Sequence, residues 1–207
     1  MIPNLIDAMP EIKSPPAFSV GVYCGSRLGS KPAYQALAQT LGSAIGQRGW
    51  QLVYGGGRAG LMGTVADATL AAGGRVVGVI PESLMKLEVG HAGLHELHVV
   101  PTMHARKQLM AERSDAFIAM PGGIGTFEEL FEVWTWRHLG YHDRPLGLLD
   151  TGGYWLPLLA FLKHSAQEGF MGDDQLAMLQ IDDDADRLLN RLLAARSDLS
   201  DDDFNRI

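Results

Sequence analysis

Short apolar runs alternate with segments of helical periodicity along most of the chain. The runs are too short for helices and are apolar almost throughout, which is typical of strands buried on both faces. We predict strands at Phe18–Cys24, Gln51–Tyr54, Arg75–Ile80, Leu97–Val100, Asp115–Met120, Leu146–Leu149 and Met178–Ile181. Apolar residues at helical spacing predict helices at Pro32–Arg48, Leu61–Ala72, Met103–Arg113, Thr126–Leu139, Tyr154–Glu168 and Ala185–Ala195.

Buried strands separated by helices indicate a parallel sheet with helices on both faces. We therefore predict an α/β fold, a single doubly wound and Rossmann-like parallel sheet, over residues 18–196. Residues 1–17 form an N-terminal extension in this interpretation, and residues 197–207 form an acidic tail. Ligands of such sheets bind beyond the carboxyl ends of the strands, so functional residues are expected at that edge.

Glycine is in excess, and its positions change the picture. The chain holds 25 glycines in 207 residues, about 12% against a usual value of about 7%. Turns that contain glycine end three predicted strands, at Cys24–Ser26, Tyr54–Gly57 and Pro121–Thr126. The carboxyl ends of parallel strands share one edge, and glycine lets the backbone approach a ligand closely there. A helix that starts at such a turn offers free N–H groups, so the sequence predicts an anion site, most naturally for phosphate.

Charged residues flank this predicted phosphate site. Thr126 is expected to donate its hydroxyl to the ligand or to cap the helix. Glu128 and Glu129 suit a helix N-terminus electrostatically, so one interpretation is structural. The other is that a carboxylate beside a phosphate acts on the sugar end of a nucleotide. Arg106 and Lys107 oppose the dipole of their own predicted helix, so an anionic ligand or a carboxylate is expected opposite them.

Several other chemistries fit the sequence poorly. Gly55, Gly57 and Gly60 match a dinucleotide fingerprint, but they follow the second strand, whereas the fingerprint belongs after the first. The histidines between His91 and His98 lack the HExxH order, and we favour a solvated loop over a metal site. Cys24 ends an apolar run and is expected to be a buried, unreactive thiol.

The net charge and the search for targeting signals narrow the possible partners and cellular locations. The 17 basic and 24 acidic residues give a net charge of −7, which disfavours nucleic-acid binding. No apolar stretch reaches the roughly 18 residues of a membrane span, and no signal peptide is recognisable. A single cysteine suits a reducing compartment, so a cytoplasmic location is expected.

These segments together resemble the LONELY GUY (LOG) family of cytokinin-activating phosphoribohydrolases, whose bacterial members were long labelled lysine decarboxylases. The signature PGGxGTxxE is present at Pro121–Glu129, and the accompanying MHxRK motif is present at Met103–Lys107. The match runs from about Phe18 to about Gly169, with further family blocks at Cys24–Ser26, Tyr54–Gly57, Gly60–Gly63 and Gly78–Pro81.

The resemblance implies hydrolysis of the N-glycosidic bond of an adenosine 5′-monophosphate, often N6-modified, to free base and ribose 5-phosphate. It implies that Arg106 and Glu129 are the catalytic pair. Substrate contacts are implied at Glu88, Arg106, Lys107, Gly123, Ile124, Gly125, Thr126, Phe127, Glu128, Glu129 and Thr135. The glycine turns would support the nucleotide through Gly25, Ser26, Gly55, Gly56, Gly57 and Gly122.

The resemblance also implies a homodimer or larger assembly with the site near the subunit interface. We expect neither a cofactor nor a metal. Plain AMP and N6-prenylated AMP both remain open as substrates. A non-catalytic nucleotide-sensing module would use the same loops but gives Arg106 and Glu129 no role. A decarboxylase would need pyridoxal phosphate, and no lysine lies in a recognisable pocket context.

Overall fold

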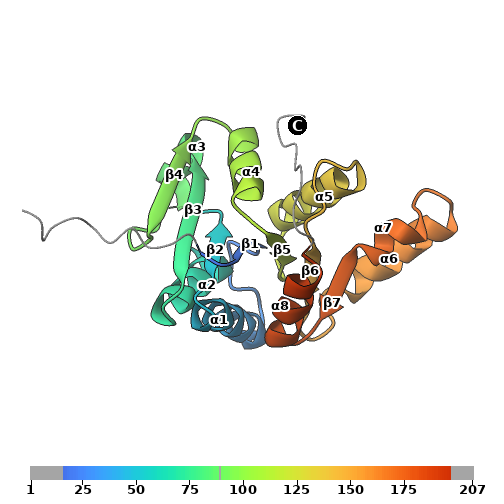
Figure 1. The fold of residues 1–207 in the computed structure, drawn as a ribbon, viewed down its shortest axis with the longest axis horizontal. Helices are drawn as coiled ribbons and strands as arrows, with labels where there is room; N and C mark the ends of the chain where they lie inside the picture. The colour runs from blue at the N-terminus through green and yellow to red at the C-terminus, as the bar shows by residue number, and fades with distance from the viewer. Residues whose placement is uncertain (1–15, 89, 197–207) are drawn as a thin grey trace, which may run out of the picture.

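The computed structural model describes residues 16–88 and 90–196, so the predicted acidic tail and most of the predicted N-terminal extension lie outside the described residues. At its centre is a seven-stranded sheet with the order β4-β3-β2-β1-β5-β6-β7 (Figure 1). Every pair of neighbouring strands is parallel. The strands are β1 (Ser19–Tyr23), β2 (Gln51–Tyr54), β3 (Arg75–Pro81), β4 (Glu96–Val100), β5 (Ala116–Ala119), β6 (Leu146–Leu149) and β7 (Leu179–Asp182).

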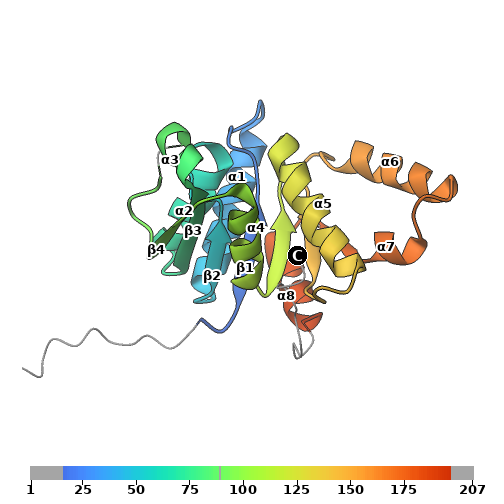
Figure 2. The same cartoon turned by 90° about the horizontal axis from the view of Figure 1, so that it is seen from above.

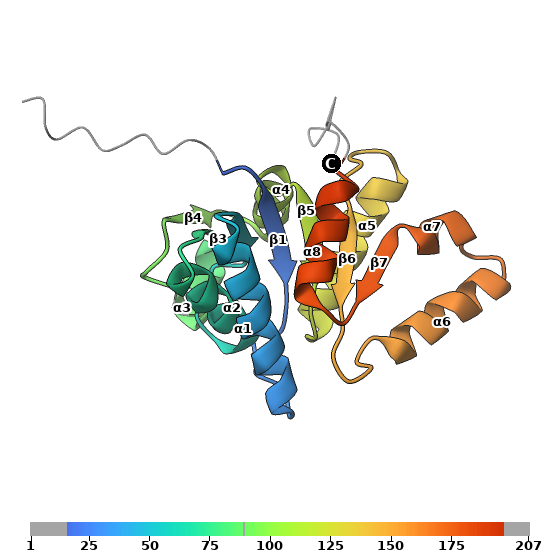
Figure 3. The ribbon, with the colours of Figure 1, turned by 60° about the horizontal axis from the view of Figure 1, so that its bottom comes forward.

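Helices cover both faces of this sheet. In Figure 2, α4 (Met103–Glu112) and α5 (Ile124–His138) lie in front of the strands. In Figure 3, α1 (Pro32–Gln47) and α8 (Ala185–Ala194) lie in front of the opposite face, beside α2 (Gly60–Ala71). The remaining helices are α3 (Glu82–Glu88), α6 (Leu156–Gln167) and α7 (Asp173–Ala177), of which α6 and α7 extend beyond β7 (Figure 1).

Each face has its own hydrophobic core. One core joins the strands to α1, α2 and α8, with Leu41, Val65 and Leu188 fully buried. The other joins the strands to α4 and α5, through Met110 and Leu130. Strand residues point alternately into the two cores, which explains why the inner strands are mostly apolar. The predicted doubly wound α/β fold is confirmed.

The chain order creates a crevice beside β1. From β1 the chain moves outward through β2 and β3 to β4, and it then returns to pair β5 with the other side of β1. The helices that follow β1 and β5 lie on opposite faces, so the connections at these two strand ends diverge and leave a gap at the carboxyl edge. This topological switch point is where open α/β sheets bind ligands.

All predicted strands and helices are present within two residues of their predicted ends. The short helices α3 and α7 were not predicted, because seven and five residues are too few to show a helical period. The predicted solvated loop is present between the two ends, where Ala92, Gly93 and His95 are exposed. His91 itself is only 7% exposed, which the prediction missed, and His98 lies in β4, as the predicted strand Leu97–Val100 requires. No helix within the described ranges is long and apolar enough to cross a membrane.

Candidate active site

The first turn of α5 lies at the switch point and offers unpaired backbone N–H groups. Its N-cap is Gly123, which has no side chain, so no side chain caps the helix. The expectation that Thr126 caps it is therefore wrong. Thr126 is instead buried in the first turn, beneath Gly122. An uncapped N-terminus that faces open space is a favourable position for an anion.

The three glycine turns meet at this point, as the parallel sheet requires. The N–H of Gly25 donates to the carbonyl of Pro121 with an N–O distance of 3.1 Å, which joins the turns after β1 and β5. The N–H of Leu61 donates to the carbonyl of Gly25 at 3.0 Å, which adds the segment after β2. Of the predicted cradle glycines, only Gly56 has a positive φ, of 76°.

Close packing explains most of the other cradle glycines. A Cβ on Gly25 would lie 3.3 Å from the Cα of Gly122, so the two turns approach too closely for side chains. Gly123 and Gly125 differ, because a Cβ on either would have no neighbour within 4 Å. Their bare faces therefore border the open space at the start of α5, where a ligand can approach the backbone.

Arg106 and Glu129 meet beside this helix start. Arg106 lies in the second turn of α4, whose N-terminus is capped by the Thr102 hydroxyl, accepting from Ala105 N at 3.1 Å. Its Nη2 lies 3.3 Å from Glu129 Oε1, and the two side chains are only 8% and 13% exposed. Arginine is always charged in proteins, so Glu129 faces a buried cation. Arg106 Nε is buried and has no hydrogen-bond partner within the described part of the chain.

Lys107 also faces carboxylates, which confirms the expectation for both cations. Its Nζ lies 2.5 Å from Glu128 Oε1 and 2.9 Å from Glu132 Oε1. Burial lowers the pKa of Lys107, but the hydrogen bonds to the two carboxylates outweigh burial and raise it above its ordinary value. Lys107 is therefore a cation whose charge is neutralised by α5.

An open cleft of about 590 Å³ lies between the turns after β1 and β5, and Arg106 and Glu129 are in its wall. Tyr34 and Tyr154 meet edge to face in the same wall, 5.9 Å between ring centroids, and the Tyr154 hydroxyl donates to the carbonyl of Gly122. The described residues that line it are Cys24, Gly25, Ser26, Arg27, Leu28, Gly29, Tyr34, Leu61, Met62, Arg106, Pro121, Gly122, Gly123, Ile124, Gly125, Thr126, Glu129 and Tyr154.

Some residues implied by the resemblance do not line this cleft. Phe127 packs edge to face on Trp155, 6.0 Å between centroids. Thr135 is exposed on α5 and its hydroxyl donates to the carbonyl of Phe131 at 2.6 Å. Gly55, Gly56, Gly57, Lys107 and Glu128 lie outside the lining as well. Glu88 is the last residue of α3, and its side chain lies outside the described residues.

Sequence reasoning missed several lining residues. Arg27 directly follows the glycine turn after β1, and that position was a signal for a second cation at the site. Tyr34 and Tyr154 gave no local signal, because they reach the cleft from α1 and from the connection after β6. Only the tertiary arrangement brings these two rings together.

Cys24 and the histidines are the other candidates for a reactive or metal-binding group. Burial, and next the charge of Glu129, raises the pKa of Cys24 far above its ordinary value, so the thiol stays protonated. This agrees with the predicted unreactive thiol. Across residues 16–88 and 90–196, no group of three or more His, Cys, Asp or Glu side chains is placed to hold a metal ion.

Comparison with known proteins points to one family. The family model described as "possible lysine decarboxylase" matches residues 62–192. A cytokinin riboside 5′-monophosphate phosphoribohydrolase of Rhodococcoides fascians is 56% identical over 154 residues, which are 74% of this chain and 78% of that protein. An Arabidopsis thaliana protein of the same name is 49% identical over 150 residues, 72% of this chain and 70% of that protein.

The fold is shared more widely. The molybdenum cofactor binding protein of Rippkaea orientalis superposes with a TM-score of 0.65 at 20% identity, covering 86% of this chain and 97% of that one. At this identity the likeness concerns the fold alone. The family follows from the sequence relatives.

Proposed function

Because the chain belongs to the family of cytokinin riboside 5′-monophosphate phosphoribohydrolases, we infer that it hydrolyses the N-glycosidic bond of N6-modified adenosine 5′-monophosphates. The products are the free base, a cytokinin, and ribose 5-phosphate. In this reaction the bond between the anomeric carbon and the base nitrogen breaks. Water supplies the hydroxyl group on the sugar and the proton on the base.

The observation that carries the chemical assignment is the buried ion pair of Arg106 and Glu129, which lies in the cleft beside an uncapped helix start. The N–H groups from Gly123 to Thr126 would hold the 5′-phosphate. Glu129 is five residues beyond Ile124, the first residue of α5, so its carboxylate lies one and a half turns beyond the phosphate position. That spacing suits a phosphate at one end of a ribose and an anomeric carbon at the other.

Cleavage of a ribosyl C–N bond develops positive charge on the sugar, as glycoside hydrolysis does. The Glu129 carboxylate would stabilise that charge and orient the attacking water. Arg106 would keep Glu129 ionised and fix its direction. Phosphate binding at α5 would supply the energy that places the anomeric carbon against Glu129. We also assign substrate contacts to the cleft residues Ile124 and Gly125, and we keep Lys107, Phe127, Glu128, Thr135 and Glu88 as contacts proposed from the family resemblance.

The decarboxylase description of the family model finds no support in the cleft. Pyridoxal phosphate enzymes need a lysine that forms a Schiff base in the site. No lysine is among the described residues that line the cleft. Lys107, the lysine in the MHxRK motif, is paired with Glu128 and Glu132.

The test is incubation of the purified protein with AMP and with isopentenyl-AMP, followed by chromatography for free base. We expect release of free base and an equal amount of ribose 5-phosphate. Faster cleavage of isopentenyl-AMP supports a role in cytokinin formation, whereas equal rates support nucleotide salvage. Binding of both nucleotides without base release would instead identify a nucleotide-sensing module and contradict the hydrolase assignment.

We further propose that the protein is a homodimer or larger homo-oligomer and works in the cytoplasm. Large apolar side chains are exposed on and beside α6, with Leu156 64%, Phe161 65% and Phe170 84% exposed. Apolar clusters of this kind favour association. Light scattering after size exclusion measures the assembly directly, and a monomer at micromolar concentration would contradict the proposal.

A further inference from the structure

His91 joins three segments that are separate in the sequence. Its ring is buried, and Nε2 lies 2.8 Å from Oδ1 of Asp67 in α2. Its Nδ1 accepts the N–H of Gly93 at 3.2 Å. Since Nδ1 is an acceptor, we assign the ring proton to Nε2, from which it is donated to the Asp67 carboxylate. The backbone N–H of His91 donates to the carbonyl of Gly56 at 3.1 Å.

These contacts, which we call the His91 clasp, hold the loop that follows β2. Gly57 and Gly90 add an antiparallel bridge beside the bond to Gly56. Asp67 lies in α2, which begins directly after this loop. The clasp therefore holds the loop in two ways, through a hydrogen bond to its backbone and through a hydrogen bond to the helix that follows it. Gly56 is in the left-handed region, φ 76°, which glycine adopts without strain and other residues rarely adopt.

The clasped loop forms a wall behind Arg106. The backbone at Gly55 lies so close to the guanidinium that a Cβ there would collide with Nη2. The polar contacts of Arg106 are long, 3.3 Å from Nη2 to Glu129 and 3.5 Å from Nη1 to the Met103 sulfur. Its Nε has no hydrogen-bond partner among the described residues. Packing against Gly55 therefore has a large share in fixing the direction of the guanidinium.

We propose that His91 is a positioning residue, which holds the loop at Gly55–Gly57 so that Arg106 keeps its direction toward Glu129. The inference rests on the proposed function, because that function makes Arg106 catalytic. None of the hydrogen bonds of the clasp among the described residues involves the start of α5, where the phosphate is proposed to bind. Loss of the clasp should therefore lower kcat and leave the KM for AMP nearly unchanged.

The sharpest test uses Asp67, because its side chain is 65% exposed and its replacement leaves the core intact. Asp67→Ala removes the acceptor for His91, whereas Asp67→Asn keeps an oxygen in the same place. We expect Asp67→Ala to lower kcat about tenfold, since a small displacement of a catalytic group has effects of this order. Asp67→Asn should retain kcat close to that of the wild-type protein.

His91→Ala should lower kcat at least as much, and the double variant His91→Ala with Asp67→Ala should be no slower than His91→Ala alone. Thermal unfolding of each variant separates loss of fold from loss of position. A wild-type kcat for Asp67→Ala, an equal loss for Asp67→Asn, or a change confined to KM would each overturn the inference.

A second measurement does not depend on turnover. In protein with ¹⁵N-labelled arginine, the Nε–H signal of Arg106 should shift or broaden in Asp67→Ala and stay in place in Asp67→Asn. If the wild-type protein releases no base, the proposed function fails, and this signal alone decides whether the clasp positions Arg106. An Arg106 signal that is identical in all three proteins would refute the positioning role.

Discussion

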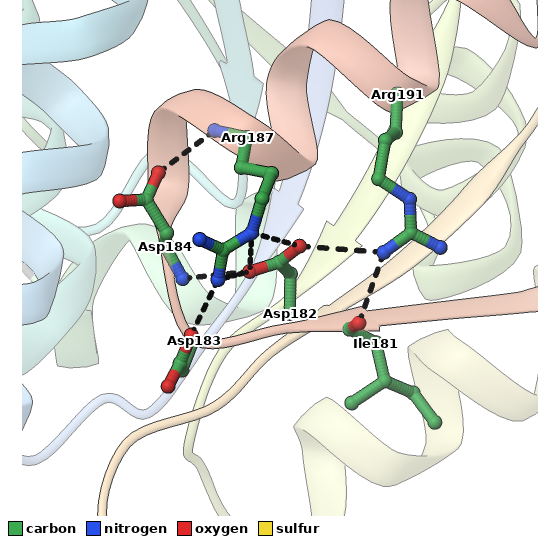
Figure 4. Close-up of polar contacts among 6 residues, drawn as sticks. All are labelled: Ile181, Asp182, Asp183, Asp184, Arg187 and Arg191. Carbon is green, nitrogen blue, oxygen red and sulfur yellow. Dashed lines mark hydrogen bonds and ion pairs between the residues drawn. The ribbon is translucent and has the colours of Figure 1, made fainter.

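Two clusters of arginine and carboxylate side chains lie at the carboxyl edge of the sheet. They differ in how many hydrogen bonds their charged groups make with neighbouring residues. In the cluster after β7, both carboxylate oxygens of Asp182 accept hydrogen bonds from other members of the cluster (Figure 4). Asp182 accepts from Arg187 Nε at 2.9 Å, from Arg191 Nη1 at 3.3 Å and from the backbone of Asp184 at 3.0 Å. Asp184 in turn caps α8 by accepting from the N–H of Arg187 at 2.8 Å.

The cluster in the cleft is built differently. Arg106 Nη2 lies 3.3 Å from Glu129 Oε1, and Arg106 Nε lacks a partner among the described residues. The Asp182 cluster docks α8 onto the end of β7, whereas the Arg106 pair borders an open cavity. Charges that stabilise a fold are satisfied by neighbouring residues, and charges that act on a substrate retain capacity for it.

Glu129→Gln is expected to have the largest effect on activity. The amide is nearly the same size but cannot stabilise positive charge on the ribose, so kcat should fall by about 10³-fold. Chromatographic base release measures it, and thermal unfolding should show an intact fold. The matched variant in the other cluster, Asp182→Asn, should leave kcat unchanged. Wild-type turnover by Glu129→Gln would remove the distinction between the clusters.

Arg106→Lys is the next test, because it keeps the charge and changes the shape. Lysine lacks the planar fork and cannot pack its charge against Gly55 while it faces Glu129. We expect kcat to fall by about 10²-fold, in keeping with a misplaced catalytic group. Arg187→Lys in the Asp182 cluster is the control and should keep full activity. Equal kcat values for the wild-type protein and Arg106→Lys would show that charge alone suffices.

The fold could be predicted from the sequence because most strands and helices have a recognisable local pattern of apolar and polar residues. The inner parallel strands are mostly apolar, and glycines follow the carboxyl ends of three strands. Short helices such as α3 were not predicted, because seven residues are too few to show the 3.6-residue helical period. The burial of His91 was also missed, because its partner Asp67 lies in another element and no local pattern shows that contact.

The site could be predicted only in part, because some of its residues come together only through contacts between distant elements. Arg106 is a cation near the N-terminus of α4, where the helix dipole favours anions. This local conflict indicates an anionic ligand or a carboxylate opposite Arg106. Glu129 was found because it lies in the motif that starts α5. The aromatic wall of Tyr34 and Tyr154 depends on the packing of α1 against the connection after β6, which leaves no local trace.

Gly125→Ala tests the cleft at the phosphate end, with a smaller expected effect. Gly125 lies in the first turn of α5, and a Cβ there has no protein neighbour within 4 Å. Alanine should therefore keep the fold, and it should stabilise the helix by up to about 1 kcal/mol. The methyl group would face the bound phosphate, and we expect KM for AMP to rise about tenfold. Inhibition by free adenine, which has no phosphate, is the control and should not change.

Asp182→Asn tests the Asp182 cluster, where the expected effect is on stability and is the smallest. The variant loses charge-assisted hydrogen bonds that are partly open to solvent, so we expect the free energy of unfolding at pH 7 to fall by about 1–2 kcal/mol. Urea unfolding measures this difference, while base release should be unaffected. An unchanged free energy of unfolding would show that the cluster contributes no net stability.

The pH dependence of that difference separates the charge of Asp182 from its shape. Hydrogen bonds from Arg187, together with that from the backbone of Asp184, lower the pKa of Asp182 to about 2 against an ordinary value of about 4. Because the folded pKa is the lower one, the contribution is complete above about pH 5 and is lost as the pH falls from about 4 to about 2. Protonated aspartate and asparagine are both neutral, so the unfolding free energies of wild-type protein and Asp182→Asn should converge over this range. A constant difference down to pH 2 would mean that packing, and not charge, holds α8 against β7.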